Sequence, residues 1–164
     1  MPSSDIATRI YHSALGLLAR REHSCHELQQ KLLQRFPDAS ESIHSMLMRL
    51  IDEGYQSDAR YVEVYIRSRM NKGFGPQRLR QELRLRGIEQ HVIDDAFRRM
   101  SQESEGKHVE NLLHLWNKKF KNLPKDSREK FQQMNFLRYR GFSSKEIEDL
   151  FVHLAERDTS AGFE

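Results

Sequence analysis

A short pattern that occurs three times constrains the fold of this chain more than any other feature. Each copy has a basic residue, a helix-capping residue three positions later, and apolar residues four and eight positions after the cap. The copies are Arg21-Glu22-His23-Ser24, Lys72-Gly73-Phe74-Gly75 and Arg140-Gly141-Phe142-Ser143. The capping residues are 51 and 68 positions apart, and the difference of 17 residues is about one helix. The repeat therefore predicts a tandem array of small helical units.

The middle copy reads as a helix end followed directly by a helix start. Gly73 suits the left-handed position just past a helix, while Gly75 and Pro76 suit the N-cap and the first helical residue. Gly87 then ends the new helix. The other two copies have a Ser-x-x-Glu capping box, which the middle copy lacks. We interpret this loss as selection on the surface of the middle copy rather than on the stability of its helix.

The remaining pattern predicts an all-α protein of about nine helices with no sheet. Apolar residues recur at helical spacing, and no alternating run bounded by turns is present. We expect an elongated array of three-helix units at residues 1–55, 56–103 and 104–164, because such units mainly contact their neighbours in sequence. Residues 101–106 read as a polar connection, and the tail after Glu156 is predicted to fray. The helix after Tyr55 has apolar residues on several sides, including Val64, which predicts a central position.

Positive charge is concentrated in the middle unit. Between Arg67 and Arg86 there are seven basic residues and one acid, Glu82, whereas the whole chain has a formal charge of only +3. This asymmetry predicts a contact surface for a polyanion or an acidic protein. Its candidate residues are Arg67, Arg69, Lys72, Arg78, Arg80, Arg84, Leu85 and Arg86, with Leu85 as an exposed apolar anchor. The alternative is a solvated helix on which Arg78 pairs with Glu82.

Several other functional classes find little support in the sequence. No nucleophile, base and orienting group can be assembled, so we expect no enzyme, no catalytic residue and no cofactor. His23, Cys25 and His26 lack the further ligands that a zinc site needs, so we expect no metal. A lowered thiol pKa at Cys25, next to a helix cap, is an alternative to an ordinary half-exposed thiol. The single cysteine, the lack of a signal sequence and the lack of a long apolar run predict a cytoplasmic protein outside the membrane.

The motifs resemble those of the RecX family of bacterial recombination regulators. The resemblance is carried by residues 58–67 and by Lys72-Gly73-Phe74-Gly75-Pro76 with the helix up to Ile88. Residues 19–28 and 136–142 support it near the two ends of the chain. The resemblance follows the order of the chain over nearly its whole length.

This resemblance implies a monomeric, non-catalytic protein of three-helix units that binds the RecA recombinase. Members of the family dock in the groove of the RecA filament on single-stranded DNA, and they limit filament extension, ATP hydrolysis, strand exchange and co-protease activity. The implied processes are DNA repair by homologous recombination and the SOS response. Non-specific contact with DNA phosphate is a further expectation from the arginines. The alternative function is a helix-turn-helix protein that binds DNA directly, because short helices joined by glycine turns are typical of that class.

Overall fold

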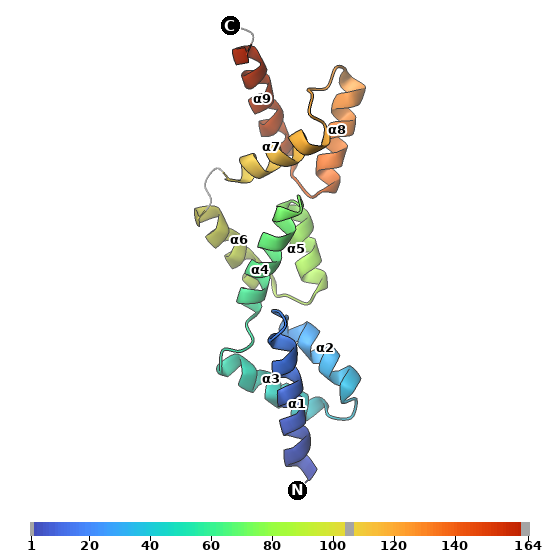
Figure 1. The fold of residues 1–164 in the computed structure, drawn as a ribbon, viewed down its shortest axis with the longest axis vertical. Helices are drawn as coiled ribbons and strands as arrows, with labels where there is room; N and C mark the ends of the chain where they lie inside the picture. Colours follow the sequence, from blue (N-terminus) through green and yellow to red (C-terminus); the bar gives the residue numbers. More distant parts are fainter. Residues whose placement is uncertain (1, 104–106, 162–164) are drawn as a thin grey trace. The chain divides into compact units, whose positions relative to one another are not determined.

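A computed structural model describes residues 2–103 and 107–161, with only the backbone of 2–4, 107, 108, 160 and 161. These residues form nine helices and no strand, which confirms the all-α prediction (Figure 1). The helices are α1 (Pro2–Leu18), α2 (Cys25–Arg35), α3 (Ser40–Asp52), α4 (Asp58–Asn71), α5 (Pro76–Leu85), α6 (Gln90–Glu103), α7 (Lys107–Lys119), α8 (Ser127–Tyr139) and α9 (Ser144–Ala161).

The first three helices pack against one another (Figure 1). Their shared core includes Ile10, Leu28 and Ile43, all without solvent exposure, because the apolar residues recur at helical spacing. The Oγ of Ser24 accepts a hydrogen bond from the N–H of Glu27 at 3.1 Å, which confirms the predicted cap of α2.

The last three helices form a second core, in which α9 packs against both α7 and α8. Trp116 is buried there, and its Nε1 donates to Oε1 of the buried Gln133 at 2.8 Å. Ser143 and Glu146 form the complete predicted capping box at the start of α9, with bonds of 2.7 and 3.2 Å. Three helices, α2 to α4, lie between the first two caps in sequence, and four, α5 to α8, lie between the last two. This confirms the predicted extra helix.

The predicted turns of the middle copy are also confirmed. Helix α5 begins at Pro76, and Gly73 and Gly87 have φ angles of +85° and +76°, which favour glycine. The helix α4 before this turn is covered on fewer sides than the sequence predicts. Val64 is 51% exposed, so the prediction that apolar residues are covered all round α4 is wrong for this residue.

Two further segments differ from the prediction. Helix α6 continues to Glu103, so the first three residues of the predicted connection at 101–106 are helical, while 104–106 lie outside the described residues. Helix α9 runs through Glu156 to Ala161, where fraying is predicted. Both segments are polar, and helix formers such as Glu and Ala extend a helix without needing buried apolar partners.

The chain also divides into two compact units whose borders fall within α4 and α5. We call residues 1–65 with 82–97 the N-terminal compact unit, and residues 66–81 with 98–164 the C-terminal compact unit. These borders differ from those of the three predicted three-helix units. The predicted division into residues 1–55, 56–103 and 104–164 therefore stays a prediction.

Candidate functional site

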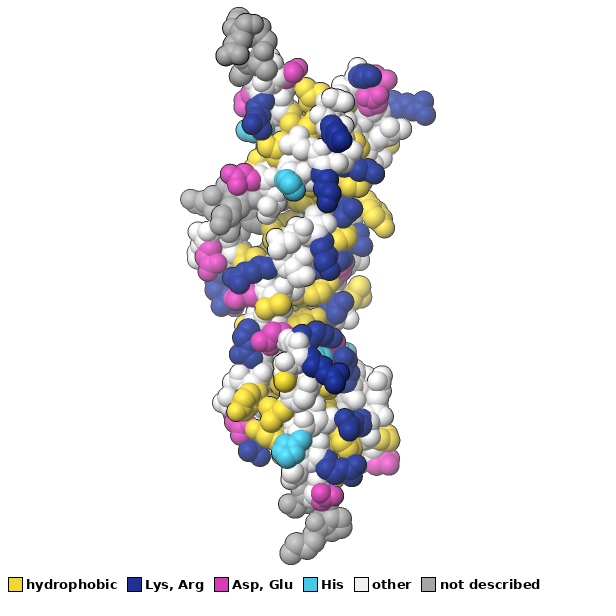
Figure 2. Space-filling model, in the orientation of Figure 1, with side chains coloured by type: hydrophobic (Ala, Val, Ile, Leu, Met, Phe, Trp, Pro, Cys, Tyr) yellow, Lys and Arg dark blue, Asp and Glu magenta, His cyan; other side chains and the backbone are white. Residues whose placement is uncertain are grey.

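The predicted contact residues are divided between the two compact units. Arg67, Arg69, Lys72, Arg78 and Arg80 belong to the C-terminal compact unit, and Arg84, Leu85 and Arg86 to the N-terminal compact unit. On the face drawn in Figure 2, Lys and Arg side chains are spread along the chain with Asp and Glu between them. Leu85, the apolar candidate, is 80% exposed as predicted. Its role as an anchor stays a prediction.

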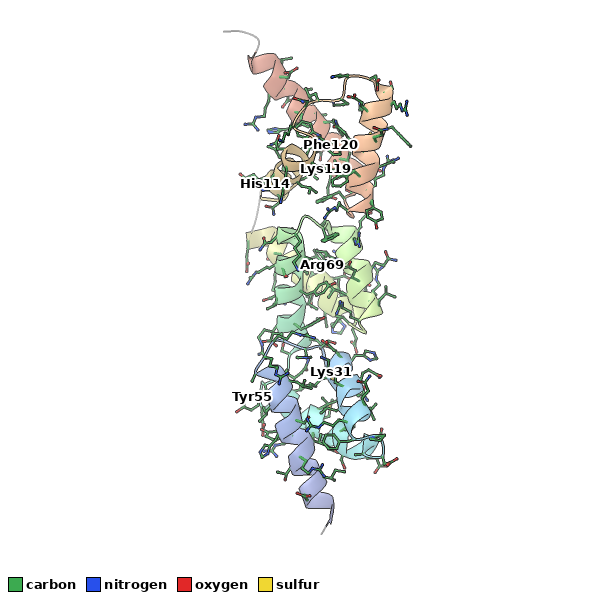
Figure 3. The ribbon with its side chains drawn as sticks, turned by 45° about the vertical axis from the view of Figure 1, so that its right-hand side comes forward. Lys31, Tyr55, Arg69, His114, Lys119 and Phe120 are labelled. Carbon is green, nitrogen blue, oxygen red and sulfur yellow. The ribbon has the colours of Figure 1, made fainter. Side chains whose placement is uncertain are left out.

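Three arginines of the C-terminal compact unit surround the ring of Phe74. The guanidinium carbons of Arg69, Arg78 and Arg140 lie 3.8, 4.6 and 4.8 Å from the ring centroid. Figure 3 shows Arg69, which comes from the last turn of α4. Such contacts contribute about 0.5–2 kcal/mol each, so Phe74 holds these cations in one cluster. Phe74 and Arg140 are absent from the predicted contact residues, although both lie within copies of the repeat.

Arg78 connects this cluster to an exposed aromatic side chain. Its guanidinium lies 5.2 Å from the ring centroid of Tyr139, and its Nη1 donates to the carbonyl oxygen of Tyr139 at 3.3 Å. The side chain of Tyr139 is nevertheless 75% exposed. The cluster of Arg69, Phe74, Arg78, Tyr139 and Arg140, which we call the Phe74 cluster, therefore combines cations with an accessible ring. The spacing of apolar residues in α8 does not predict the exposure of Tyr139, because helical spacing places Tyr139 beside apolar residues.

The backbones of two repeat copies meet directly beneath the Phe74 cluster. The N–H groups of Gly75 and Gln77 donate to the carbonyl oxygens of Arg140 and Gly141 at 2.7 and 3.0 Å. A Cβ on Gly75 would lie 2.6 Å from the carbonyl carbon of Gly141, a distance that real Cβ atoms do not show. Packing thus accounts for the glycine at position 75 without selection on the surface. For Arg78, which takes the place of the capping-box glutamate, the interpretation stays a prediction.

In the N-terminal compact unit, Arg86 lies against two tyrosines. Its Nη1 donates to the hydroxyl of Tyr61 at 3.3 Å, and its guanidinium lies 4.8 Å from the ring centroid of Tyr65. The hydroxyl of Tyr65 donates to Oε2 of Glu82 at 2.6 Å. Burial and this hydrogen bond raise the pKa of Tyr65. Glu82 thus accepts a hydrogen bond from Tyr65, and its predicted pairing with Arg78 stays a prediction.

The other predicted residues differ in their exposure. Arg67 and Lys72 are exposed, and Arg80 is half-buried. Arg84 is exposed, and its Nε donates to Oε1 of Gln90 at 2.7 Å. Arg67, Lys72 and Arg84 are consequently the candidates whose charges can change with the least effect on packing.

The compact units carry opposite formal charges. The C-terminal compact unit has 18 Lys and Arg against 11 Asp and Glu, which gives +7. The N-terminal compact unit has 9 against 13, which gives −4. Residues 66–81 contain five basic residues and no acid. A polyanion is therefore attracted to the C-terminal compact unit and repelled by the net charge of the other.

The cysteine and histidines near the first cap have structural surroundings. His23 is buried, and its Nδ1 donates to the carbonyl oxygen of Arg21 at 3.0 Å, so its Nε2 accepts from Nζ of Lys31 at 3.4 Å. Burial, followed by the charge of Asp58, raises the pKa of the Cys25 thiol, so the alternative of a lowered pKa is wrong. Within residues 2–103 and 107–161, no group of three His, Cys, Asp or Glu is placed to hold a metal ion. No helix in this part of the chain is long and apolar enough to span a membrane.

Three family models match successive parts of the chain. They are the first three-helix domain of RecX at residues 11–40, the second at 57–96 and the third at 105–151. A regulatory protein RecX from Pseudomonas entomophila (strain L48) is 45% identical over 145 residues, covering 87% of this chain and 90% of that protein. The chain belongs to the RecX family.

Other RecX proteins support this assignment over most of the chain. A regulatory protein RecX from Pseudomonas putida (strain KT2440 and its equivalents) is 45% identical over 139 residues, covering 84% of this chain and 86% of that one. A crystal structure of a regulatory protein RecX matches with a TM-score of 0.72 at 25% identity, covering 91% of this chain and 73% of that one. The crystal structure of RecX from Lactobacillus salivarius matches the fold with a TM-score of 0.76 at 24% identity, covering 93% and 98%.

The matched ranges of the RecX domain models show which domain contains each of the residues discussed above. The second domain contains the predicted contact residues and Phe74, while the third contains Tyr139 and Arg140. The Phe74 cluster therefore joins residues of two RecX domains within one compact unit. Membership of this family identifies the chain as a regulatory protein, and the sequence-based expectation of the RecX family is confirmed.

Proposed function

We propose that this protein regulates the RecA recombinase in the cytoplasm by docking, as a monomer, in the groove of the RecA filament on single-stranded DNA. Docking limits filament extension, ATP hydrolysis, strand exchange and co-protease activity. Membership of the RecX family is the observation that carries this proposal. The +7 charge of the C-terminal compact unit supports it, because a filament on DNA presents phosphate along its length.

The proposed mechanism requires binding but no bond making or breaking. A protein that binds one state of a filament more tightly than another shifts the population toward the favoured state. We assign the contacts to Arg67, Lys72 and Arg84, which are exposed, and to Leu85 as their apolar neighbour in sequence. Arg69, Arg78, Arg80 and Arg86 complete the proposed surface, although the contacts of Arg69, Arg78 and Arg86 with aromatic rings also give them a role in packing.

The test is a titration of the single-stranded-DNA-dependent ATPase of RecA from the same organism. We expect the wild-type chain to inhibit it, at well below one copy per RecA subunit if the protein caps filament ends. Reversing two exposed charges, Arg67→Glu with Arg84→Glu, is expected to raise the half-inhibitory concentration about tenfold. The matched control is Arg128→Glu with Lys145→Glu, which changes the charge equally at two other exposed positions.

The outcomes separate the function from the surface. If the wild-type chain leaves the ATPase unchanged at every ratio, the proposed function is wrong. If the wild-type chain inhibits but both double variants behave alike, the function stands and the assigned surface is wrong. Circular dichroism of each variant verifies that its helices are intact.

Direct binding to DNA is a second candidate function, which the Phe74 cluster favours. An exposed aromatic ring beside guanidinium groups suits stacking with an unpaired base and contact with phosphate. Fluorescence anisotropy with a labelled single strand, without RecA, is expected to show binding that Tyr139→Ala weakens. Inhibition of RecA by a protein with no measurable affinity for DNA alone would exclude this candidate.

A further inference from the structure

Helices α1 and α2 form an open hollow of about 460 Å³ on the N-terminal compact unit. The residues that line it come from one face of α1, from the turn that follows α1, and from the C-terminal end of α2 with its C-cap residue. They are Arg9, His12, Ser13, Gly16, Leu17, Arg20, Arg35 and Phe36. The α1–α2 hollow lies far in sequence from the proposed contact residues, and the proposed function does not use it.

The lining of the α1–α2 hollow is strongly basic. It contains three arginines and a histidine, and no Asp or Glu is among the described residues that line it. The compact unit around it has a formal charge of −4. Three arginines therefore line one hollow on a compact unit whose net charge is negative. The hollow attracts anions, although the net charge of the unit repels them.

Contacts within the chain order two of these guanidinium groups. Those of Arg9 and Arg35 lie 5.6 and 5.8 Å from the ring centroid of Phe36, and Nη1 of Arg35 donates to Oγ of Ser13 at 3.1 Å. Phe36 is only 8% exposed and is joined by Leu17 in the lining, so part of the lining is apolar. An incoming anion thus meets cations that are already partly ordered, which lowers the entropic cost of binding.

Gly16 provides an independent observation at the same place. It lies inside α1, where glycine costs about 0.5–1 kcal/mol relative to alanine. A Cβ added to it would meet no atom within 4 Å, and its φ angle is not in the left-handed region. Neither packing nor backbone conformation therefore requires a glycine. Its position in the lining indicates that the missing side chain keeps the hollow open.

We propose that the α1–α2 hollow binds a free nucleoside di- or triphosphate through its phosphate groups. Three guanidinium groups match the several negative charges of a polyphosphate better than the single charge of a carboxylate. Arginine binds phosphate oxygens through pairs of parallel N–H donors. The apolar part of the lining gives the organic portion of the ligand a place to pack, and the volume of the hollow is typical of small-ligand sites.

Isothermal titration calorimetry of the full chain with ATP, ADP and inorganic pyrophosphate tests this proposal. We expect saturable binding in which the three probes compete. Arg20→Ala and Gly16→Leu are each expected to weaken binding about tenfold or more, the first by removing charged hydrogen bonds and the second by filling the hollow. Arg128→Ala, which removes an exposed charge elsewhere, is expected to leave the affinity unchanged.

Gly16→Ala separates ligand binding from folding. Its methyl group is expected to raise the melting temperature, because alanine stabilises a helix, and yet to lower the affinity. The proposal is overturned if none of the three probes binds saturably, or if Arg20→Ala and Gly16→Leu bind as the wild type does. It is also overturned if a single-stranded oligonucleotide binds through these residues while ATP, ADP and pyrophosphate do not, since the phosphate then belongs to a nucleic acid.

Discussion

The backbone segments around Gly75 and Gly141 lie against each other, and we call this contact the backbone junction. Replacing its two glycines tests how the C-terminal compact unit is held together. Gly75→Ala is a pure packing change, because the φ angle of Gly75 is not in the left-handed region. Its Cβ would lie 2.6 Å from the carbonyl oxygen of Gly141 and 2.8 Å from the backbone nitrogen of Phe142. Both neighbours are backbone atoms, so no side-chain rotation relieves the overlap. The two segments must therefore separate.

The cost of this separation follows from what the junction contains. Hydrogen bonds to the carbonyl oxygens of Arg140 and Gly141 are stretched, at about 1 kcal/mol each, and overpacking adds about 1–3 kcal/mol. We expect Gly75→Ala to lower the free energy of unfolding by about 2–4 kcal/mol. Gly141→Ala combines a Cβ that would lie 2.4 Å from Cβ of Arg78 with a φ of +98°, so it is expected to cost more.

Gly73→Ala is the matched control in the same compact unit. Its φ of +85° imposes a cost of about 1–2 kcal/mol. Its Cβ would meet only the flexible end of Leu115, which is able to rotate away. The lower chain entropy of alanine in the unfolded state is common to all three variants, so it cancels in the comparison.

Urea denaturation followed by the fluorescence of Trp116, the only tryptophan, measures these free energies in the C-terminal compact unit. We expect Gly73→Ala to lower the free energy of unfolding least, Gly75→Ala to lower it more, and Gly141→Ala to lower it most. The double variant Gly75→Ala with Gly141→Ala is expected to cost less than the sum of its parts, because the first change already opens the junction. A Gly75→Ala protein within about 0.5 kcal/mol of the wild type would refute the reasoning.

Two further predictions concern buried polar groups. Burial lowers the pKa of His23 in the folded protein. As the pH falls through about 6.5, the ordinary pKa of histidine, the unfolded chain therefore takes up a proton that the folded protein does not, and the free energy of unfolding falls. Between pH 7 and pH 5 the wild type is expected to lose more unfolding free energy than His23→Gln, and equal losses would contradict this. Gln133→Leu leaves the buried Nε1 of Trp116 without its acceptor, at a cost of about 1–3 kcal/mol that urea denaturation measures. An unchanged midpoint would show that this bond contributes nothing net.

The sequence predicts the helices well because their signals are local. Glycine with a positive φ, serine with glutamate three residues later, and apolar residues at helical spacing all act within one or two turns. Helix α5 illustrates this, since Gly73, Gly75, Pro76 and Gly87 define both of its ends. The exposure of Leu85 follows equally from its position opposite Leu79 and Leu83 on the helix.

The candidate site was less predictable because its contacts join distant parts of the chain. Phe74 and Arg140 are 66 residues apart, and no local pattern indicates that they meet. The same applies to Gly75, whose role depends on Gly141. The middle copy lacks the Ser-x-x-Glu capping box of the other two copies, so the departure itself is visible in the sequence. Its cause is not, because a missing cap is compatible with close packing as well as with selection for surface contact.

The double role of the arginines determines which functional experiments are informative. Arg78 stacks on Phe74 and Tyr139, and Arg140 donates to the carbonyl oxygen of Lys72 at 3.2 Å. Loss of the proposed RecA inhibition on removing either arginine would therefore report a disturbed junction as readily as a lost contact. Arg67→Glu changes charge at an exposed position, whereas Phe74→Leu weakens the cluster without changing charge. If Arg67→Glu reduces inhibition at unchanged stability while Phe74→Leu reduces both together, charge acts at the partner surface and the ring acts through the fold.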